Sequence, residues 1–121
     1  MNQSTQQTAS LEDNNLAFLS AWKTGVLISG PSLFGCQANA PDSAVTWRQL
    51  TPKLDVMRKA IPNKSQTDAA FIGILASFYN AEEGQKMLNK AGCSAFGHAL
   101  SVLDKKRIDV IAALMINFGG W

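Results

Sequence analysis

One histidine and two cysteines are the side chains of this sequence best suited to nucleophilic or metal chemistry. His98 is the only imidazole, which removes every mechanism that needs two. Cys36 and Cys93 lie far apart in the chain and lack the paired short spacings typical of zinc sites. Cys93 and His98 flank an expected helix start, which gives their side chains no reason to meet. We therefore expect two buried thiols and no catalytic residue, cofactor or metal ion.

The carboxylates offer no better case for catalysis. Glu82, Glu83, Asp104 and Asp109 all fall in or near the expected first turn of a helix, where negative charge stabilises the helix by about 0.3–1 kcal/mol. The glycines between Gly92 and Gly97 lack the Lys-Ser/Thr pair and the preceding strand of a phosphate-binding loop. The sequence therefore predicts a protein that is not an enzyme.

Basic side chains form local groups that could follow a phosphate backbone. The net charge of +2 is low for a protein held to nucleic acid mainly by phosphate contacts. Residues 65–91 nevertheless allow a helix-turn-helix interpretation, with residues 81–91 as the recognition helix. A nucleic-acid-binding regulator is thus the alternative function, and a solvated helix face is the simpler explanation of the same charges. The candidate residues for this alternative are Lys53, Arg58, Lys59, Gln85, Lys86, Asn89, Lys90, Lys105, Lys106 and Arg107.

Aromatic residues are numerous for a small core, and tryptophan is common in interfaces as well as in interiors. Trp121 follows Gly119-Gly120, so it either docks onto the helices or is displayed to a partner. The loop from Gly30 to Pro41 is rich in turn residues, and loops of this kind often carry function. The candidate residues for partner binding are Leu33, Phe34, Trp47 and Trp121.

Length and composition predict one globular domain. The chain has 121 residues, of which 46% are hydrophobic and 17% are charged. No apolar run reaches the roughly 18–20 residues of a membrane helix. Residues 1–9 are rich in Gln, Ser and Thr and predict a flexible tail, so we expect the domain to cover residues 10–121.

Helix starts and stops can be placed along the first half of the chain. The first helix is expected from Ser10 to just before Gly30-Pro31. Any strand is a minor component near residues 26–33. Asp42 or Ser43 is expected to cap a short helix through Leu50, and Thr51-Pro52 is expected to open another that ends at Pro62-Asn63.

The second half of the chain contains the expected centre of the fold. Residues Ala69 to Tyr79 are apolar on nearly every side, which is typical of a central helix. Ser65 or Thr67 is expected to cap this helix, and Gly73 to let another helix approach closely. Asn80 is expected to cap a helix that ends at Gly92.

Two shorter predictions complete the chain. Residues 94–103 predict a short helix that packs through Phe96, Leu100 and Leu103, and Asp104 is expected to cap the last helix. In that helix we expect one buried stripe, which consists of Ile108, Ile111, Ala112, Met115 and Phe118. Val110 and Leu114 are expected to widen it. The predicted fold is all-α: a single-domain bundle of about five or six short helices around residues 69–79.

Location and function follow from these patterns. Leu33-Phe34-Gly35-Cys36 resembles a bacterial lipoprotein cleavage box, but the polar, acidic start of the chain is unlike an export signal. We expect a cytoplasmic protein, with an exported lipoprotein processed at Cys36 as the alternative. The size and the Gln-rich start are typical of a bacterial, plasmid or phage accessory protein. The predicted function is a small non-enzymatic module that binds another protein or a second copy of itself.

Overall fold

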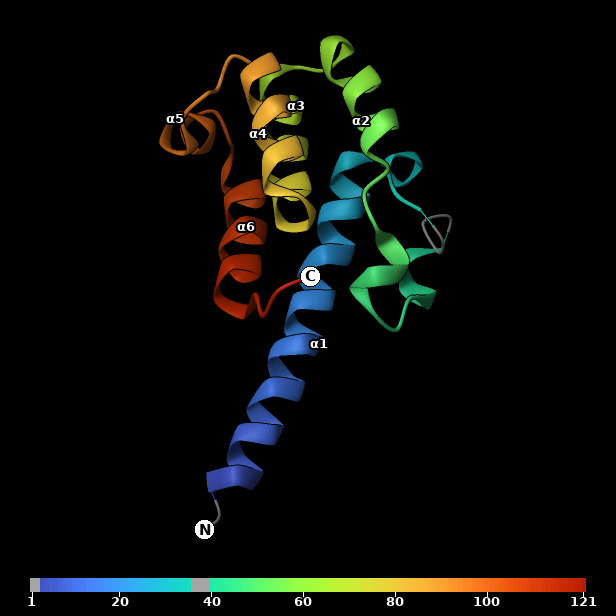
Figure 1. The fold of residues 1–121 in the computed structure, drawn as a ribbon, viewed down its shortest axis with the longest axis vertical. Helices are drawn as coiled ribbons and strands as arrows, with labels where there is room; N and C mark the ends of the chain where they lie inside the picture. The colour runs from blue at the N-terminus through green and yellow to red at the C-terminus, as the bar shows by residue number, and fades with distance from the viewer. Residues whose placement is uncertain (1–2, 36–39) are drawn as a thin grey trace.

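The computed structural model describes the backbone of residues 3–35 and 40–121, and the side chains of residues 13–35 and 40–121. Figure 1 shows an all-α fold, and the described residues contain no strand beyond an isolated bridge between Phe34 and Pro52. Cys36 lies outside the described residues. In the described residues the α-helices are, in order, α1 Gln3–Ser29, α2 Leu54–Ala60, α3 Gln66–Tyr79, α4 Ala81–Lys90, α5 Phe96–Ser101 and α6 Lys105–Asn117. The same residues form the 3-10 helices η1 Pro31–Leu33, η3 Pro41–Ser43, η4 Trp47–Leu50 and η5 Ile61–Asn63.

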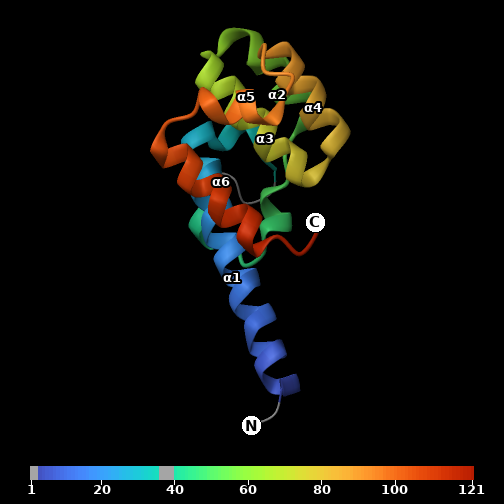
Figure 2. The ribbon, with the colours of Figure 1, turned by 90° about the vertical axis from the view of Figure 1, so that its left-hand side faces the viewer.

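Helix α1 begins at Gln3, earlier than the expected start at Ser10. Its first turns extend beyond the rest of the molecule in both views (Figures 1 and 2). The predicted flexibility of residues 1–9 stays a prediction. The helix ends where expected: Gly30 has φ +114, a conformation that favours glycine, and Pro31 follows it.

Helix α3 is the centre of the fold, as predicted. Eight consecutive residues from Ala69 to Ala76 are buried, so every side of the helix is covered. The Ser65 hydroxyl caps it by accepting a hydrogen bond from the backbone N–H of Asp68 (3.1 Å). This burial makes α3 the element against which the other helices are positioned.

Helices α3 and α4 form a tight antiparallel hairpin joined by Asn80 alone. A Cβ at Gly73 would lie 2.9 Å from Leu88 Cδ2, which confirms the predicted close approach. One helical turn nearer the connection, a Cβ at Gly84 would lie 2.1 Å from Ser77 Oγ. Asn80 ends α3 and also caps α4, because its side chain accepts a hydrogen bond from the N–H of Glu83 (3.1 Å).

Helix α6 runs antiparallel beside α1 and closes the other side of the core (Figures 1 and 2). Aromatic rings join the two helices to α3. The ring of Phe18 lies 5.7 Å from that of Phe118 and 6.1 Å from that of Phe78, and Phe78 and Phe118 are 5.1 Å apart. Residues from both ends of the chain therefore build one core.

The short helix before α2 is capped differently from the prediction. Neither Asp42 nor Ser43 caps it; the cap is Thr46, in a capping box with Gln49, whose side chain accepts from the N–H of Thr46 (3.3 Å). The segment is the 3-10 helix η4. Trp22 fixes it to α1, because its indole N–H donates to the Leu50 carbonyl (2.8 Å) in the core.

Helix α2 starts later than Thr51-Pro52 predicts. Two hydrogen bonds hold this stretch extended: Gly35 N–H donates to the Thr51 carbonyl and Lys53 N–H to the Leu33 carbonyl, both at 2.9 Å. Helical geometry therefore begins only at Leu54. The helix ends at Ala60, just before η5, in agreement with the expected stop at Pro62-Asn63.

The buried stripe of α6 is rotated from the predicted one. Val110, Ile111 and Leu114 are its buried residues, whereas Ala112 and Met115 are exposed. The three buried residues all belong to the predicted set, but the prediction that Ala112 and Met115 are buried too is wrong, because periodicity within α6 does not show which edge of a wide apolar stripe faces inward. Packing against both α1 and α3 decides the rotation. In the described part of the chain no helix is long and apolar enough to span a membrane.

Candidate functional site

The residues predicted to bind a partner lie largely in the core. Leu33 and Phe34 are buried, and Phe34 packs edge-on against Trp22 at 5.9 Å between ring centroids. Trp47 is half-buried and meets Phe18 at 5.2 Å. These side chains hold the 30–35 and 46–50 segments on α1, so they offer little surface to another protein.

Trp121 is docked. Its ring lies 4.9 Å from Trp22 and 5.3 Å from Tyr79, both in edge-to-face geometry. The Arg48 guanidinium donates a hydrogen bond to its carbonyl oxygen. The segment after α6 therefore returns across α1 and α3 and covers the aromatic core.

An apolar groove lies between the α3–α4 hairpin, α5 and α6; it is called the hairpin groove below. Its volume is about 370 Å³, within the usual range of binding pockets. Phe96, Met115 and Phe118 are 45%, 55% and 43% exposed, so large apolar side chains stand on its walls. The lining residues are Ile74, Ser77, Phe78, Ala81, Gln85, Leu88, Phe96, Met115 and Phe118.

The two polar side chains that line the hairpin groove already donate hydrogen bonds to other groups of the chain. Ser77 Oγ donates to the Gly73 carbonyl (2.9 Å). Gln85 Nε2 donates to Asn89 Oδ1 (3.1 Å) and to the Ser94 carbonyl (2.8 Å). None of the described residues that line the groove is charged. What it offers a ligand is therefore apolar contact with few polar requirements.

Sequence reasoning missed this groove because it assigned its walls to the core. Phe96 was expected to pack inward from 94–103, and Met115 and Phe118 were expected in the buried stripe of α6. The signal was present in the surplus of apolar residues on α6, since Val110 and Leu114 already supply a buried face. When a helix has apolar residues on two sides and the core covers only one of them, the other side stays exposed.

A second depression lies between α1 and α6. It measures about 650 Å³ and is lined mainly by small side chains of α1, with three charged residues of α6. Its lining residues are Ala17, Ser20, Ala21, Thr24, Lys105, Lys106, Asp109, Val110 and Ala113. Helix α6 separates it from the hairpin groove, so the two surfaces can be altered independently.

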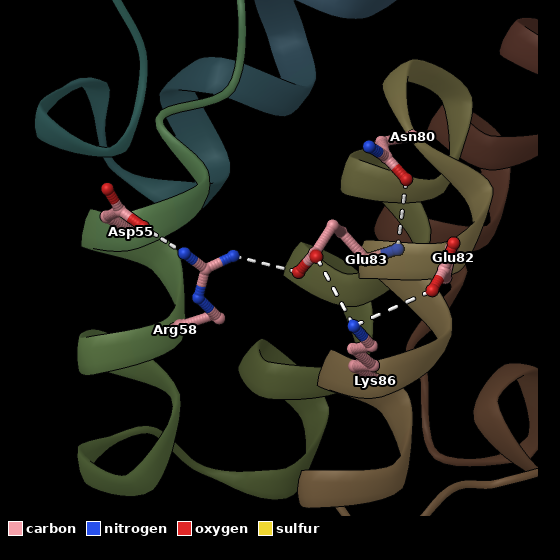
Figure 3. Close-up of polar contacts among 6 residues, drawn as sticks. All are labelled: Asp55, Arg58, Asn80, Glu82, Glu83 and Lys86. Atoms are coloured by element: carbon pink, nitrogen blue, oxygen red, sulfur yellow. Dashed lines mark hydrogen bonds and ion pairs between the residues drawn. The ribbon is translucent and has the colours of Figure 1, made fainter.

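Figure 3 shows ion pairs that engage two of the candidate nucleic-acid-binding residues. Arg58 lies between Asp55 and Glu83, with 2.8 Å from Nη1 to Glu83 Oε2. Lys86 lies 3.5 Å from Glu83 and 3.7 Å from Glu82. Three carboxylates thus surround two cations, which lowers the positive potential available to a phosphate backbone.

The basic start of α6 is paired in the same way. Arg107 contacts Asp68 (2.7 Å) and Asp104 (2.6 Å), and Lys105 contacts Asp109 (2.8 Å). The backbone N–H of Arg107 donates to the Asp104 carboxylate, and this bond is the largest cause that lowers the pKa of Asp104; the Arg107 charge lowers it further. The other candidates, Lys53, Lys59, Gln85, Asn89, Lys90 and Lys106, are exposed.

The α3–α4 arrangement differs from a helix-turn-helix. Helix-turn-helix motifs join two helices at about 90–120°. Here Gly73 meets Leu88 and Gly84 meets Ser77, and at the far end Gln66 Nε2 donates to the Ala91 carbonyl (3.2 Å), so α4 follows α3 along its length. Nucleic-acid binding itself stays a prediction.

The groups that could have supported catalysis lie in different surroundings. Cys93 is buried, whereas His98 is exposed on α5. Among the described side chains, no group of three or more His, Cys, Asp or Glu residues is placed to hold a metal ion.

Comparison of the chain with protein-family models, with curated proteins and with solved structures finds no match. The surfaces of the molecule therefore provide the basis for a functional proposal.

Proposed function

We propose that this chain is a small non-enzymatic protein-binding module, and that its hairpin groove takes the apolar face of an amphipathic helix of another protein. Partner helices of this kind bind hydrophobic grooves through side chains that recur every third or fourth residue. The single observation that supports the proposal is the partial exposure of Phe96, Met115 and Phe118 around one continuous hollow.

The chemistry of the lining favours an uncharged, apolar contact. A charged group brought into a groove without charged lining residues would lose water and gain no ion pair. An aliphatic or aromatic side chain instead gains about 25 cal/mol for each Å² of apolar surface removed from water. Methionine at the rim also suits a protein partner, since its flexible thioether adapts to different shapes.

A library of amphipathic helical peptides, selected on the immobilised protein, tests the proposal. We expect selected peptides to perturb the amide resonances of residues that line the hairpin groove. Met115→Lys should weaken the best peptide at least about tenfold, because it places a charge against an apolar contact. Ile116→Lys is the matched control: it adds the same charge on the neighbouring, outward-facing position and should leave the affinity within about twofold.

Two results would overturn the proposal. One is a selection that yields no peptide binding more tightly than about 100 µM. The other is a set of binders whose affinity falls with Ile116→Lys and not with Met115→Lys.

The nucleic-acid alternative has weaker support, because Arg58, Lys86 and Arg107 are paired with carboxylates. It is tested by titrating random duplex DNA at low and moderate salt. Affinity that falls steeply with salt would favour it, and no binding at micromolar protein would argue against it.

A further inference from the structure

We propose that a second copy of this chain covers the outer side of α1 and α6, with a two-fold axis that makes the two α1 helices antiparallel. This surface, called the α1/α6 face below, is separate from the hairpin groove and adds self-association to the function proposed above. It consists of the exposed Asp13, Leu16 and Leu27 of α1 and the exposed Lys105, Lys106 and Ile116 of α6, around the hollow between the two helices.

The first turn of α1 whose side chains are described is open to solvent. Asp13 to Ala17 are all exposed, so more than one full turn of the helix has no buried side. The backbone continues as helix from Gln3, beyond the rest of the molecule (Figure 2). Short helical segments without tertiary packing are marginally stable in water. A second molecule beside α1 would supply the missing contacts.

Large apolar side chains mark both ends of the α1/α6 face. Leu16 and Leu27 are 65% and 57% exposed, and their spacing, with Ser20 and Thr24 between them, keeps them on one side of α1. Ile116 on α6 is 79% exposed. The small residues between them leave a hollow of about 650 Å³. Apolar projections flanking a hollow allow the same surface to pack against a copy of itself.

Charge decides the orientation of the second copy. Helix α6 is antiparallel to α1 (Figure 1). Lys105 and Lys106, at the start of α6, therefore lie toward the Thr24 end of the face, and Asp13, nearer the start of α1, lies at the opposite end. Among the ion pairs of the described side chains, none involves Asp13 or Lys106. An antiparallel two-fold arrangement brings Asp13 of each copy to the lysine end of the other, whereas a parallel arrangement does not.

The molar mass of the full chain in solution, measured from about 1 to 500 µM by light scattering and sedimentation, tests this proposal. We expect a monomer–dimer equilibrium within that range. Ile116→Lys should raise the dissociation constant at least about tenfold, since it places a lysine in each of the two symmetry-related apolar contacts. Met115→Lys, in the hairpin groove, is the matched control and should leave the constant within about twofold.

A charge exchange tests the orientation. Asp13→Lys should weaken the dimer by about 3- to 30-fold, and Asp13→Lys with Lys106→Asp should restore it to within about threefold of the original constant. Both substitutions are at exposed positions, so the folded state should persist, which the far-UV circular dichroism of each variant checks.

A chain that stays monomeric at every concentration overturns the proposal. So does a dimer that Met115→Lys dissociates while Ile116→Lys leaves it intact, and so does a charge exchange that fails to restore association. Each of these results leaves the peptide binding of the hairpin groove undecided, so the two proposals fail separately.

Discussion

Gly84 allows the closest approach between α3 and α4, because it has no Cβ. A Cβ there would lie 2.1 Å from Ser77 Oγ, 2.6 Å from Ser77 N and 2.7 Å from Ser77 Cα. Two of these neighbours are backbone atoms, which cannot move without separating α3 from α4. We expect Gly84→Ala to lower the free energy of unfolding by about 2–4 kcal/mol, measured by urea denaturation.

Gly97 provides the matched control on a helix. No atom outside its neighbourhood lies within 4 Å of a Cβ built there. Gly97→Ala should leave the stability unchanged or raise it by up to about 1 kcal/mol, because alanine has the higher helix propensity. Equal losses for both glycines would contradict the close approach at Ser77.

The Asp104 carboxylate at the start of α6 makes the stability of the fold depend on pH. Its pKa is lowered from the ordinary value of 3.8, first by the hydrogen bond from the Arg107 backbone and then by the Arg107 charge. A lowered folded-state pKa gives stability that is present above pH about 4 and is lost as the pH falls through the folded-state value. The urea midpoint should therefore fall less on acidification in Asp104→Asn than in the original protein.

Asparagine is the appropriate replacement because it also caps helices, so the comparison isolates the charge. Parallel losses in the two proteins between pH about 5 and 2 would show that Asp104 does not contribute to the acid dependence.

The caps of α3, α4 and α6 were predictable residue by residue, those of η4 and α2 were not, and close approaches were predictable only in part. Ser65, Asn80 and Asp104 cap the helices that the sequence assigned to them, since capping depends on neighbours in the chain. Gly73 was predicted to admit another helix because it interrupts an apolar run. Gly84 gave no such signal, because its neighbours in the chain are polar and do not form an apolar run.

At the scale of elements, α3 is supported on all sides and should be sensitive to any loss of volume. Leu75 is fully buried beside α1, where its Cδ atoms would lie 3.3 Å from a Cβ at Gly25. Leu75→Ala should cost about 2–5 kcal/mol in the free energy of unfolding, through lost burial and the cavity left behind.

Leu27→Ala on the exposed side of α1 is the companion variant. It removes the same atoms from a side chain already in contact with water and should cost less than about 1 kcal/mol in the monomer. Thermal or urea unfolding at low protein concentration compares the two. A small effect at Leu75 would mean that α3 is not the centre of the core.

The elements themselves could be located from sequence, but their rotations could not. The end of α1 at Gly30-Pro31 and the connection at Asn80 depend on local chain geometry, which the types of these residues determine. In α6 the predicted apolar set extends from Val110 and Leu114 to Ala112 and Met115, and which part of it faces inward depends on packing against α1 and α3. The exposed Met115 follows from that choice, so the sequence indicated a surplus of apolar residues on α6 but not which of them would line a groove.

At the scale of the molecule, Trp121 joins the last segment to both α1 and α3. Trp121→Ala removes ring contacts with Trp22 at 4.9 Å and Tyr79 at 5.3 Å. We expect a loss of about 2–3 kcal/mol in the free energy of unfolding, together with a change in intrinsic fluorescence, because Trp22 gains water contact.

Arg48→Ala separates the hydrogen bond from the ring contacts. It removes the donor to the Trp121 carbonyl and the guanidinium that lies 5.0 Å from the Trp47 ring centroid, and it leaves both ring pairs of Trp121 in place, so the loss should be about 1–2 kcal/mol. If Trp121→Ala cost no more than Arg48→Ala, the docked ring would not be a main contributor.

The single-residue connection between α3 and α4 has a consequence for the order in which the chain folds. Contacts across this hairpin close a very short loop, whereas those between α1 and α6 join opposite ends of the sequence and carry a larger entropy of closure. We expect the hairpin to form in the transition state. In stopped-flow kinetics, Gly84→Ala should mainly slow folding, and Ile111→Ala on α6 should mainly speed unfolding.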